Sequence, residues 1–259
     1  MSDLRLALRQ VRYENRAFWR NPTAAFFTFA FPLMFMVIFN VIFSSSDGGS
    51  GSGEPGFRAA DFFTPAIIVF AVITATFTNL AMMVTIARDA GILKLVRGTP
   101  LPGWAYLLGR ILHAVLVAFL LVVIVAAFGA FLYHVRFPWD RLPALVLTLS
   151  VAAATFCAVG LALTGLIPNA EAAPAVTNGV IFPILFISNV FIRMDQPPAW
   201  MAIISNLFPV RHFADAMALI WDPRTTGNGL SGSDLAVIGA WGVAALLVAI
   251  RSFSWEPRH

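Results

Sequence analysis

Long apolar stretches separated by short polar ones run the length of the chain. Six of them are close to the ~20 residues that a helix needs to cross a bilayer. They are residues 23–43, 62–86, 105–132, 142–167, 173–192 and 235–251. Each is expected to be helical, because lipid leaves an open backbone without hydrogen-bonding partners. Pro168 and Pro174 flank an acidic residue and predict a tight turn between the fourth and fifth stretches. The pattern predicts one all-α integral membrane domain with six transmembrane helices over residues 1–259.

Residues 1–22 predict an amphipathic helix that lies in the membrane interface. Its apolar face holds Leu4, Leu8, Val11 and Phe18. A stripe of arginines lies beside that face: Arg5, Arg9, Arg12, Arg16 and Arg20. Such a helix dips its apolar face among the lipid headgroups while the arginines reach the phosphates. The helix serves as a topology anchor or as a surface touched by a cytoplasmic partner, and the two interpretations are compatible.

Residues 87–104 form a polar connection with a short amphipathic segment inside it. Apolar residues at 92, 93, 95 and 96 surround Lys94 and precede Arg97. Glycine and proline at 98, 100, 102 and 103 then end the segment sharply. A loop built as a short capped helix suits docking in the groove of a partner, and a plain connector is the alternative.

Residues 193–233, before the last apolar stretch, contain two apolar pieces at 200–208 and 210–221. Both are too short to span a bilayer, so they predict interfacial or re-entrant helix on the external side. Arg211 and His212 precede Asp215 by four and three residues, a spacing suited to a salt bridge or hydrogen bond on one helix face. We interpret these three residues as a structural brace, with substrate contact as the alternative.

The composition supports a membrane protein and excludes a cytosolic globular enzyme. Apolar residues make up 59% of the chain and charged residues 12%, whereas soluble domains carry about 25% charged residues. With the N-terminus inside, eleven basic residues fall on the cytoplasmic side and six outside, which favours cytoplasmic termini. Residues 44–56, SSSDGGSGSGEPG, predict a flexible loop. The lone Cys157 allows no intramolecular disulfide.

Catalytic motifs are missing from the sequence. A phosphate-binding G-x-x-x-x-G-K-[ST] loop needs a lysine after glycine, and the single lysine, Lys94, follows Leu93. The chain therefore cannot supply a phosphate-binding loop of this type itself. The four histidines are scattered without an H-E-x-x-H pattern, which argues against an intramembrane hydrolase. His113 is expected to be a polar residue whose side chain is hydrogen-bonded within the protein and has no catalytic role. The spans lack central Asp and Glu, which weakens an ion-coupled carrier, although backbone carbonyls could still coordinate sodium.

Neutral polar and aromatic residues within the spans are candidates for lining a pathway. They are Asn40, Thr74, Phe77, Asn79, Asn178, Phe186 and Asn189. Small neutral polar residues more often hold membrane helices together, and that alternative stays open. A pathway of this composition suits a lipophilic or amphipathic cargo better than a sugar phosphate.

Several motifs in sequence carry a resemblance to a known family. They are RNP at 20–22, FPL at 31–33, RDAGILKLVRGTPLP at 88–102, YLLGR at 106–110 and NLFPVRHFADA at 206–216. In this order they resemble the transmembrane subunit of ABC type-2 exporters, especially bacterial drug and antibiotic export permeases related to the membrane subunit of the daunorubicin exporter. Asp89 stands where that family usually has an acidic residue, whereas Ile92 replaces a common threonine and Phe208 separates Asn206 from Pro209.

The resemblance implies a six-span permease that works as a homodimer or heterodimer in a bacterial inner membrane. Two separate ATPase subunits would bind beneath it and carry the ATP and Mg, so that the chain itself binds no cofactor or metal and is not an enzyme alone. The segment that couples the two would hold Arg88, Asp89, Gly91, Lys94 and Arg97. Membrane lipid is an expected partner and nucleic acid is not. The implied activity is export of a hydrophobic drug, antibiotic or lipid. The alternatives are a polysaccharide or glycolipid exporter and, more remotely, an ATP-independent channel or secondary carrier.

Overall fold

The computed structural model describes residues 3–44, 58–99, 101–191 and 198–253, apart from the side chains of residues 3, 4, 44 and 97. Within these ranges the chain is helical and forms no strand. The predicted flexible loop, from residue 45 onward, lies outside the described residues. So do residues 192–197, where the fifth predicted span ends and the external segment begins.

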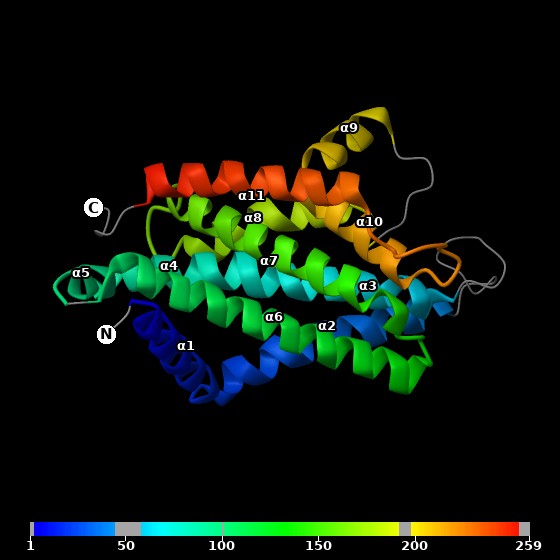
Figure 1. Cartoon of the computed structure of the whole chain (residues 1–259), viewed down its shortest axis with the longest axis horizontal. Coiled ribbons are helices and arrows are strands. Elements are labelled where there is room, and N and C mark those ends of the chain that lie inside the picture. The colour runs from blue at the N-terminus through cyan, green and yellow to red at the C-terminus, as the bar shows by residue number, and fades with distance from the viewer. Residues whose placement is uncertain (1–2, 45–57, 100, 192–197, 254–259) are drawn as a thin grey trace.

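Five helical segments in the described ranges are long and apolar enough to cross a membrane (Figure 1). They are α2 (Pro22–Ser44), the continuous rod of α3 (Ala59–Ile73), η1 (Thr74–Thr78) and α4 (Asn79–Asp89), α6 (Gly103–Tyr133), the pair η2 (Trp139–Arg141) and α7 (Leu142–Thr164), and α11 (Gly232–Ser252). The predicted first, second, third, fourth and sixth spans fall on these segments. The chain is therefore a multi-pass membrane protein.

The predicted fifth span, 173–192, is not found as one long helix. Its helical part is α8 (Ala173–Ile187), and 15 residues at 1.5 Å each cover about 22 Å of a hydrocarbon core about 30 Å thick. The helix ends because the chain turns at Ser188 and Asn189, and Asn189 adopts a left-handed backbone with φ 57°. Asparagine tolerates this conformation better than most side chains do. Sequence pattern alone missed this break, because residues 190–192 continue the apolar run.

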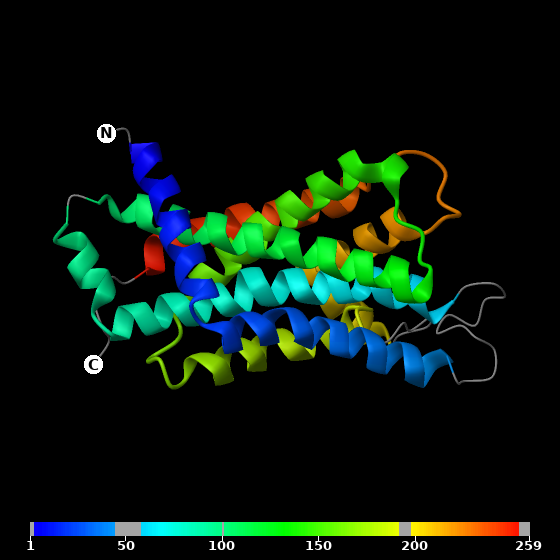
Figure 2. The ribbon, with the colours of Figure 1, turned by 90° about the horizontal axis from the view of Figure 1, so that it is seen from below.

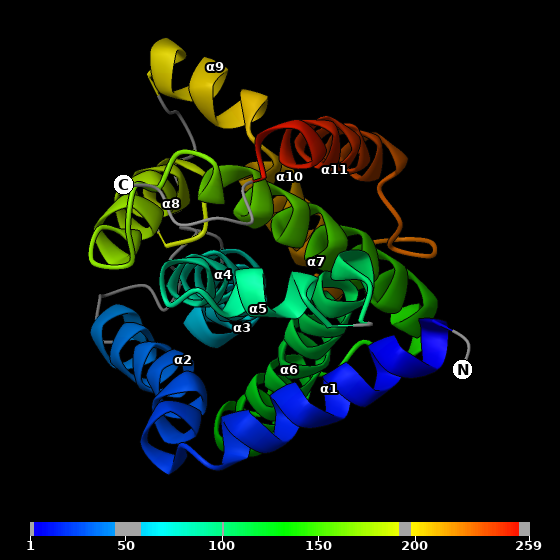
Figure 3. The ribbon, with the colours of Figure 1, turned by 90° about the vertical axis from the view of Figure 1, so that its left-hand side faces the viewer.

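The α3–η1–α4 rod lies at the centre of the bundle. Seen end-on, it is surrounded by α2, α6, α7 and α8 (Figure 3). Apart from Asp61, every residue of α3 is buried. This burial matches an apolar sequence without a polar face. By contrast, α2 and α11 bury few of their residues and lie on the outside of the bundle (Figure 3).

The middle of the central rod departs from α-helical geometry. Residues Thr74–Thr78 form a π-helical turn, which carries one extra residue per turn and widens the helix. Single π-helical turns inside longer helices occur frequently at functional sites. The sequence prediction treated 62–86 as an ordinary helix and did not anticipate this turn.

Short helices lie at the two ends of the bundle, which we call the α5 end and the α10 end. The α5 end holds α5 (Ile92–Arg97), the α7–α8 turn (residues 165–172) and the last residues of α11 (Figure 1). The α10 end holds η2 and the last residues of α10 (Pro209–Trp221), and α9 (Ala199–Leu207) precedes α10. The two short pieces predicted before the last span are thus two helices, α9 and α10.

The N-terminal helix α1 (Asp3–Trp19) crosses α6 at a steep angle (Figures 2 and 3). Its four arginines are exposed, and so is Arg20, which directly follows the helix. Its buried face, however, is centred on Ala7, and Leu8 of the predicted apolar face is 57% exposed. The two helices approach closely at Gly109, where an added Cβ would lie 2.5 Å from the Gln10 side chain. Hence α1 is docked on the protein as well as suited to the membrane interface.

Candidate functional site

The predicted coupling segment is a sharp corner between α4 and α5. Gly91 precedes α5 with φ 71°, a left-handed conformation that glycine adopts without the clash of a Cβ. Leu93 is fully buried and anchors the short helix. Lys94 is exposed and Leu95 is 71% exposed. The corner therefore presents a charged and an apolar side chain on its outer surface, and the Arg97 side chain lies outside the described part of the chain.

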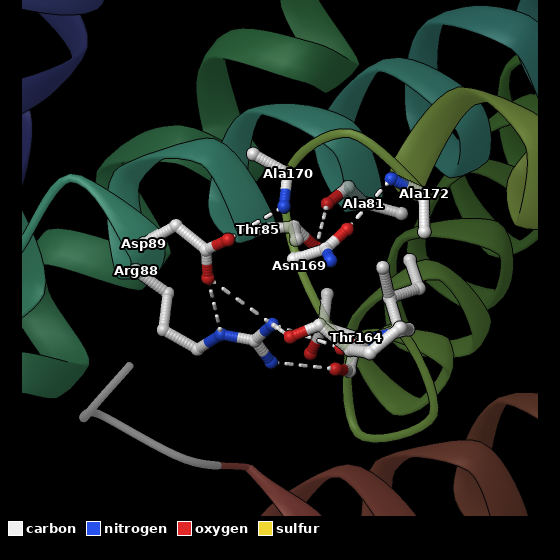
Figure 4. A network of polar contacts seen from close by, with 10 residues as sticks. Ala81, Thr85, Arg88, Asp89, Thr164, Asn169, Ala170 and Ala172 are labelled. Atoms are coloured by element: carbon white, nitrogen blue, oxygen red, sulfur yellow. Dashed lines mark hydrogen bonds and ion pairs between the residues drawn. The ribbon is translucent and has the colours of Figure 1, made fainter. Parts of the chain in front are cut away.

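Arg88, in contrast, points into the protein. Its exposed fraction is 2%, and its guanidinium donates to three backbone carbonyl oxygens at the end of α7 and in the following turn (Figure 4). The oxygens belong to Thr164 at 3.0 Å, Ile167 at 2.8 Å and Pro168 at 3.2 Å. A buried guanidinium is tolerated only when its N–H groups find acceptors, and these carbonyls supply them.

The sequence explains why these carbonyls need an external donor. In a continuing helix, the Thr164 carbonyl would accept from the N–H of residue 168, and residue 168 is a proline without an N–H. Arg88 replaces that missing donor from a helix 76 residues earlier in the chain. Its positive charge also lies at the negative end of the α7 dipole.

Asp89 completes the same network from the next position. Its Oδ1 lies 3.4 Å from the Arg88 guanidinium, and its Oδ2 accepts from the backbone N–H of Ala170 at 2.6 Å (Figure 4). Asn169 stabilises the turn itself by accepting from the N–H of Ala172 at 2.9 Å. We call Arg88 and Asp89 the α5-end clamp, because together they join α4 to the end of α7 and to the α7–α8 turn.

A second polar contact joins the N-terminal helix to α6 and was not predicted. Arg110 donates to Glu14 at 3.0 Å, and Gln10 donates to the same carboxylate oxygen at 2.9 Å. The Arg110 guanidinium also lies over the Tyr106 ring, 4.9 Å from its centroid.

The expectation that the His113 side chain has hydrogen-bond partners is wrong within the described residues, because its buried Nδ1 has no partner there.

An apolar groove runs between α2 and the central rod. Its volume is about 260 Å³, and its lining includes Phe27, Phe31 and Phe70. The polar residues in its lining are all neutral: Thr28, Thr74, Thr78 and Asn79. The π-helical turn contributes to this groove, since Thr74 and Thr78 are its first and last residues. The geometry suits a hydrophobic molecule with a few hydrogen-bonding groups.

The structure brings only part of the predicted pathway lining together. Thr74 and Asn79 share the groove just described. Asn189 lines a separate pocket at the α10 end. Asn40 and Phe77 are buried, and Asn40 donates to the Met36 carbonyl of its own helix. Asn178 is half-buried, and Phe186 is 49% exposed. The last four line neither the groove nor that pocket.

The predicted brace of Arg211, His212 and Asp215 forms in a different arrangement. Arg211 lies 3.4 Å from Asp215, as the spacing predicts. His212 instead contacts Asp234 of α11 through Nδ1 at 2.7 Å, and its Nε2 lies 3.0 Å from the Asn206 carbonyl oxygen. Burial raises the pKa of Asp215, an effect that the positive charge of Arg211 opposes. The brace therefore links α10 to α11, which a spacing rule within one helix cannot reveal.

The pocket at the α10 end contains three carboxylates, and each has an arginine nearby. Asp61 pairs with Arg58 at 3.1 Å. Asp215 pairs with Arg211, and Asp222 pairs with Arg224 at 3.0 Å. The hydrogen bond from Arg224 lowers the pKa of Asp222. Among the described residues, no group of His, Cys, Asp or Glu is arranged to hold a metal ion.

Arg141 of η2 is a further structural residue that sequence reasoning missed. It donates to the carbonyls of Ile220 at 2.9 Å and Asp222 at 2.7 Å, and also to the Leu219 and Thr225 carbonyls. We call this the α10-end clamp. It resembles the α5-end clamp, because a guanidinium again donates hydrogen bonds to the backbone carbonyls at the end of a helix.

Comparison with known proteins agrees with this architecture. The family model of the ABC-2 type transporter membrane domain matches residues 8–220. Two curated relatives carry the name probable multidrug ABC transporter permease YbhR, from Escherichia coli strain K12 and from Escherichia coli O157:H7. Each is 22% identical over 160 residues, which cover 62% of this chain and 43% of the relative. The chain thus spans less than half the length of the curated relatives it matches. With the family model covering most of the chain, the protein belongs to the ABC-2 type transporter family of membrane permeases.

Proposed function

We propose that this chain is the permease subunit of an ATP-binding-cassette exporter for a hydrophobic drug, antibiotic or lipid. A separate ATPase subunit, in two copies, hydrolyses ATP with Mg, and a second permease subunit, identical or different, completes the pathway. The protein lies in a bacterial inner membrane with both termini in the cytoplasm. The excess of basic residues on that side supports this orientation, which places the α5 end at the cytoplasm.

In the same proposal, α8 is the fifth of six crossings, α11 is the sixth, and the α9–α10 segment is re-entrant from the outside. The packing of α8 against α4 and η1 supports a position inside the bundle. The packing of α10 against α3, α7 and α11 supports its insertion below the outer surface. Buried Phe213 and Met217 on α10 fit an apolar environment.

The observation that carries the proposed cargo is the groove between α2 and the central rod. Its lining is apolar and aromatic, and its polar groups are neutral hydroxyls and one amide. Desolvating a charged cargo there would be costly, whereas a lipophilic cargo gains from burial of its apolar surface. The multidrug name of the curated relatives supports the same class of cargo.

The proposed ATPase contact is the outer surface of α5. Its exposed Leu95 and Ile92 offer apolar area, and Lys94 offers a positive charge beside them. A short helix with this face fits the groove of a soluble partner.

The test is ATP-dependent transport of a hydrophobic fluorescent dye in proteoliposomes. The permease is reconstituted with a candidate ABC ATPase subunit from the same organism, and dye movement is compared with and without ATP. An ATPase whose phosphate-loop lysine is changed to alanine is the control and is expected to abolish transport. Dye movement that needs no ATPase would favour a channel or carrier. Transport of a lipid-linked glycan in place of the dye would favour the polysaccharide alternative.

A further inference from the structure

Arg88 and Asp89, at the start of the predicted coupling segment, point in a different direction from Lys94 and Leu95. A residue that contacts a soluble partner must offer its side chain to that partner. Lys94 and Leu95 do so, whereas Arg88 is buried and its N–H groups are directed at the α7–α8 turn. Arg88 therefore has a task inside the permease.

We propose that Arg88 and Asp89 are positioning residues that fasten the α7–α8 turn to the α4–α5 corner, so that a displacement of α5 moves the start of α8. The inference rests on the proposed function, in which an ATPase docks on α5. Under it, the clamp relays movement within the permease and does not itself bind the ATPase.

The geometry of the clamp supports a rigid connection. Arg88 holds the end of α7 through the Thr164 carbonyl and the turn through the Ile167 carbonyl, and Asp89 holds the turn through the Ala170 N–H. The two bonded regions are consecutive in the chain, and so are the two clamp residues. Hydrogen bonds with a charged donor or acceptor are among the stronger ones, and Arg88 is shielded from water.

The position of the clamp connects it to the proposed pathway. Only Ala90 and Gly91 separate it from α5. On the other side of the turn, α8 packs against α4 and against the π-helical turn η1. Thr74 and Thr78 of η1 line the apolar groove. A contiguous set of packed elements therefore leads from the surface of α5 to the groove.

The experiment separates ATPase binding from coupling in the full permease–ATPase complex in proteoliposomes. Asp89→Asn keeps the size of the side chain and removes the charge that pairs with Arg88. We expect ATPase binding to stay unchanged while the amount of dye transported per ATP falls about tenfold, within the usual range of coupling between sites. Leu95→Asp, on the exposed face of α5, is expected to weaken ATPase binding itself. Asp140→Asn, an exposed charge at the α10 end, is the control and changes neither quantity.

A cysteine pair tests whether a physical link is what matters. Asp89→Cys with Ala170→Cys, in a Cys157→Ser background, replaces the clamp with a disulfide that forms when an added copper–phenanthroline oxidant removes two electrons from the two thiols. A short bis-methanethiosulfonate linker, which joins each thiol by disulfide exchange, is the alternative, and reductant cleaves both links. Coupling should be low in the reduced pair, return on cross-linking and fall again with reductant. This arm also covers an Asp89→Asn variant that fails to fold.

Three outcomes would overturn the inference. Asp89→Asn weakening ATPase binding as much as Leu95→Asp would make Asp89 a contact residue. An unchanged amount of dye transported per ATP in Asp89→Asn would mean that Asp89 has no part in coupling. A cross-linked pair that still transports little dye per ATP would mean that movement is not transmitted through the α7–α8 turn. Failure of the unmodified permease to bind any ATPase would instead contradict the proposed function, which is a separate result.

Discussion

The two ends of the bundle use the same device in different surroundings. At each end, an arginine donates to backbone carbonyls where a helix stops: Arg88 at the end of α7 and Arg141 at the end of α10. Arg88 is 2% exposed and has a carboxylate beside it in the chain. Arg141 is half-buried, and the carboxylate of nearby Asp222 is already bonded to Arg224. The comparison teaches that burial, more than the number of hydrogen bonds, decides how costly the loss of each clamp will be.

The largest effect is expected for Arg88→Ala. The change leaves buried carbonyls without donors and Asp89 without its partner, a loss typical of a broken buried pair, about 3–5 kcal/mol of unfolding free energy. Chemical unfolding in detergent measures it. Arg136→Ala, which removes an exposed arginine, is the control and should leave stability unchanged. A loss for Arg88→Ala no greater than that for Arg141→Ala would contradict the comparison.

A smaller loss is expected for Arg141→Ala, about 1–3 kcal/mol, because water can reach part of the site and replace the lost donor. Hydrogen exchange should increase in residues 219–225 and stay unchanged around the α7–α8 turn. Faster exchange at both ends would show that the clamps do not act independently.

The corner next to the α5-end clamp gives a sharper test of its geometry. Gly91→Ala forces a Cβ into a left-handed conformation and should cost about 1–2 kcal/mol. Gly98→Ala, at the other end of α5, is the matched control, because Gly98 has an ordinary helical conformation with φ −80°. Equal unfolding midpoints for the two variants would mean that the corner relaxes without strain.

The smallest effect concerns the ion pair beside the α10-end clamp. The pKa of Asp222 is held below its ordinary value of 3.8 by the hydrogen bond from Arg224. Since the folded-state pKa lies below the unfolded one, the pair stabilises the protein above the unfolded pKa, and this contribution is lost as pH falls through the folded pKa. Asp222→Asn should therefore cost less than about 1 kcal/mol at neutral pH. The difference from the unmodified protein should vanish in acid, and a constant difference at all pH values would rule out this cause.

Patterns that act over a few residues predicted local structure well. The apolar runs located five long helices, Pro168 marked the α7–α8 turn, and prolines and glycines ended α5. The same patterns failed where the backbone departs from regular geometry. The π-helical turn at 74–78 contains three threonines, and the break lies at Ser188 and Asn189. Small neutral polar residues also occur inside regular membrane helices, so hydropathy did not mark either departure.

Contacts between distant segments were beyond local patterns. The spacing of His212 and Asp215 suggested a bond within one helix, but His212 bonds to Asp234 in another helix. Glu14 and Arg110 are 96 residues apart, and nothing in either neighbourhood marks them as partners. One signal was available: Pro168 lacks an N–H, so the Thr164 carbonyl required a donor from elsewhere.

The sequence by itself determined that this is a helical membrane protein with an arginine-rich N-terminal helix and a short amphipathic segment between its second and third apolar stretches. Apolar length, the need to satisfy the backbone in lipid, and the placement of scarce charges are enough for that conclusion. Only the tertiary structure decided which way the charged side chains of the coupling segment point. Arg88 and Lys94 lie six residues apart and carry the same charge, yet one is buried against α7 and the other faces outward. The reason is physical, because unsatisfied carbonyls 76 residues away draw Arg88 inward, and no pattern around Arg88 records where they are.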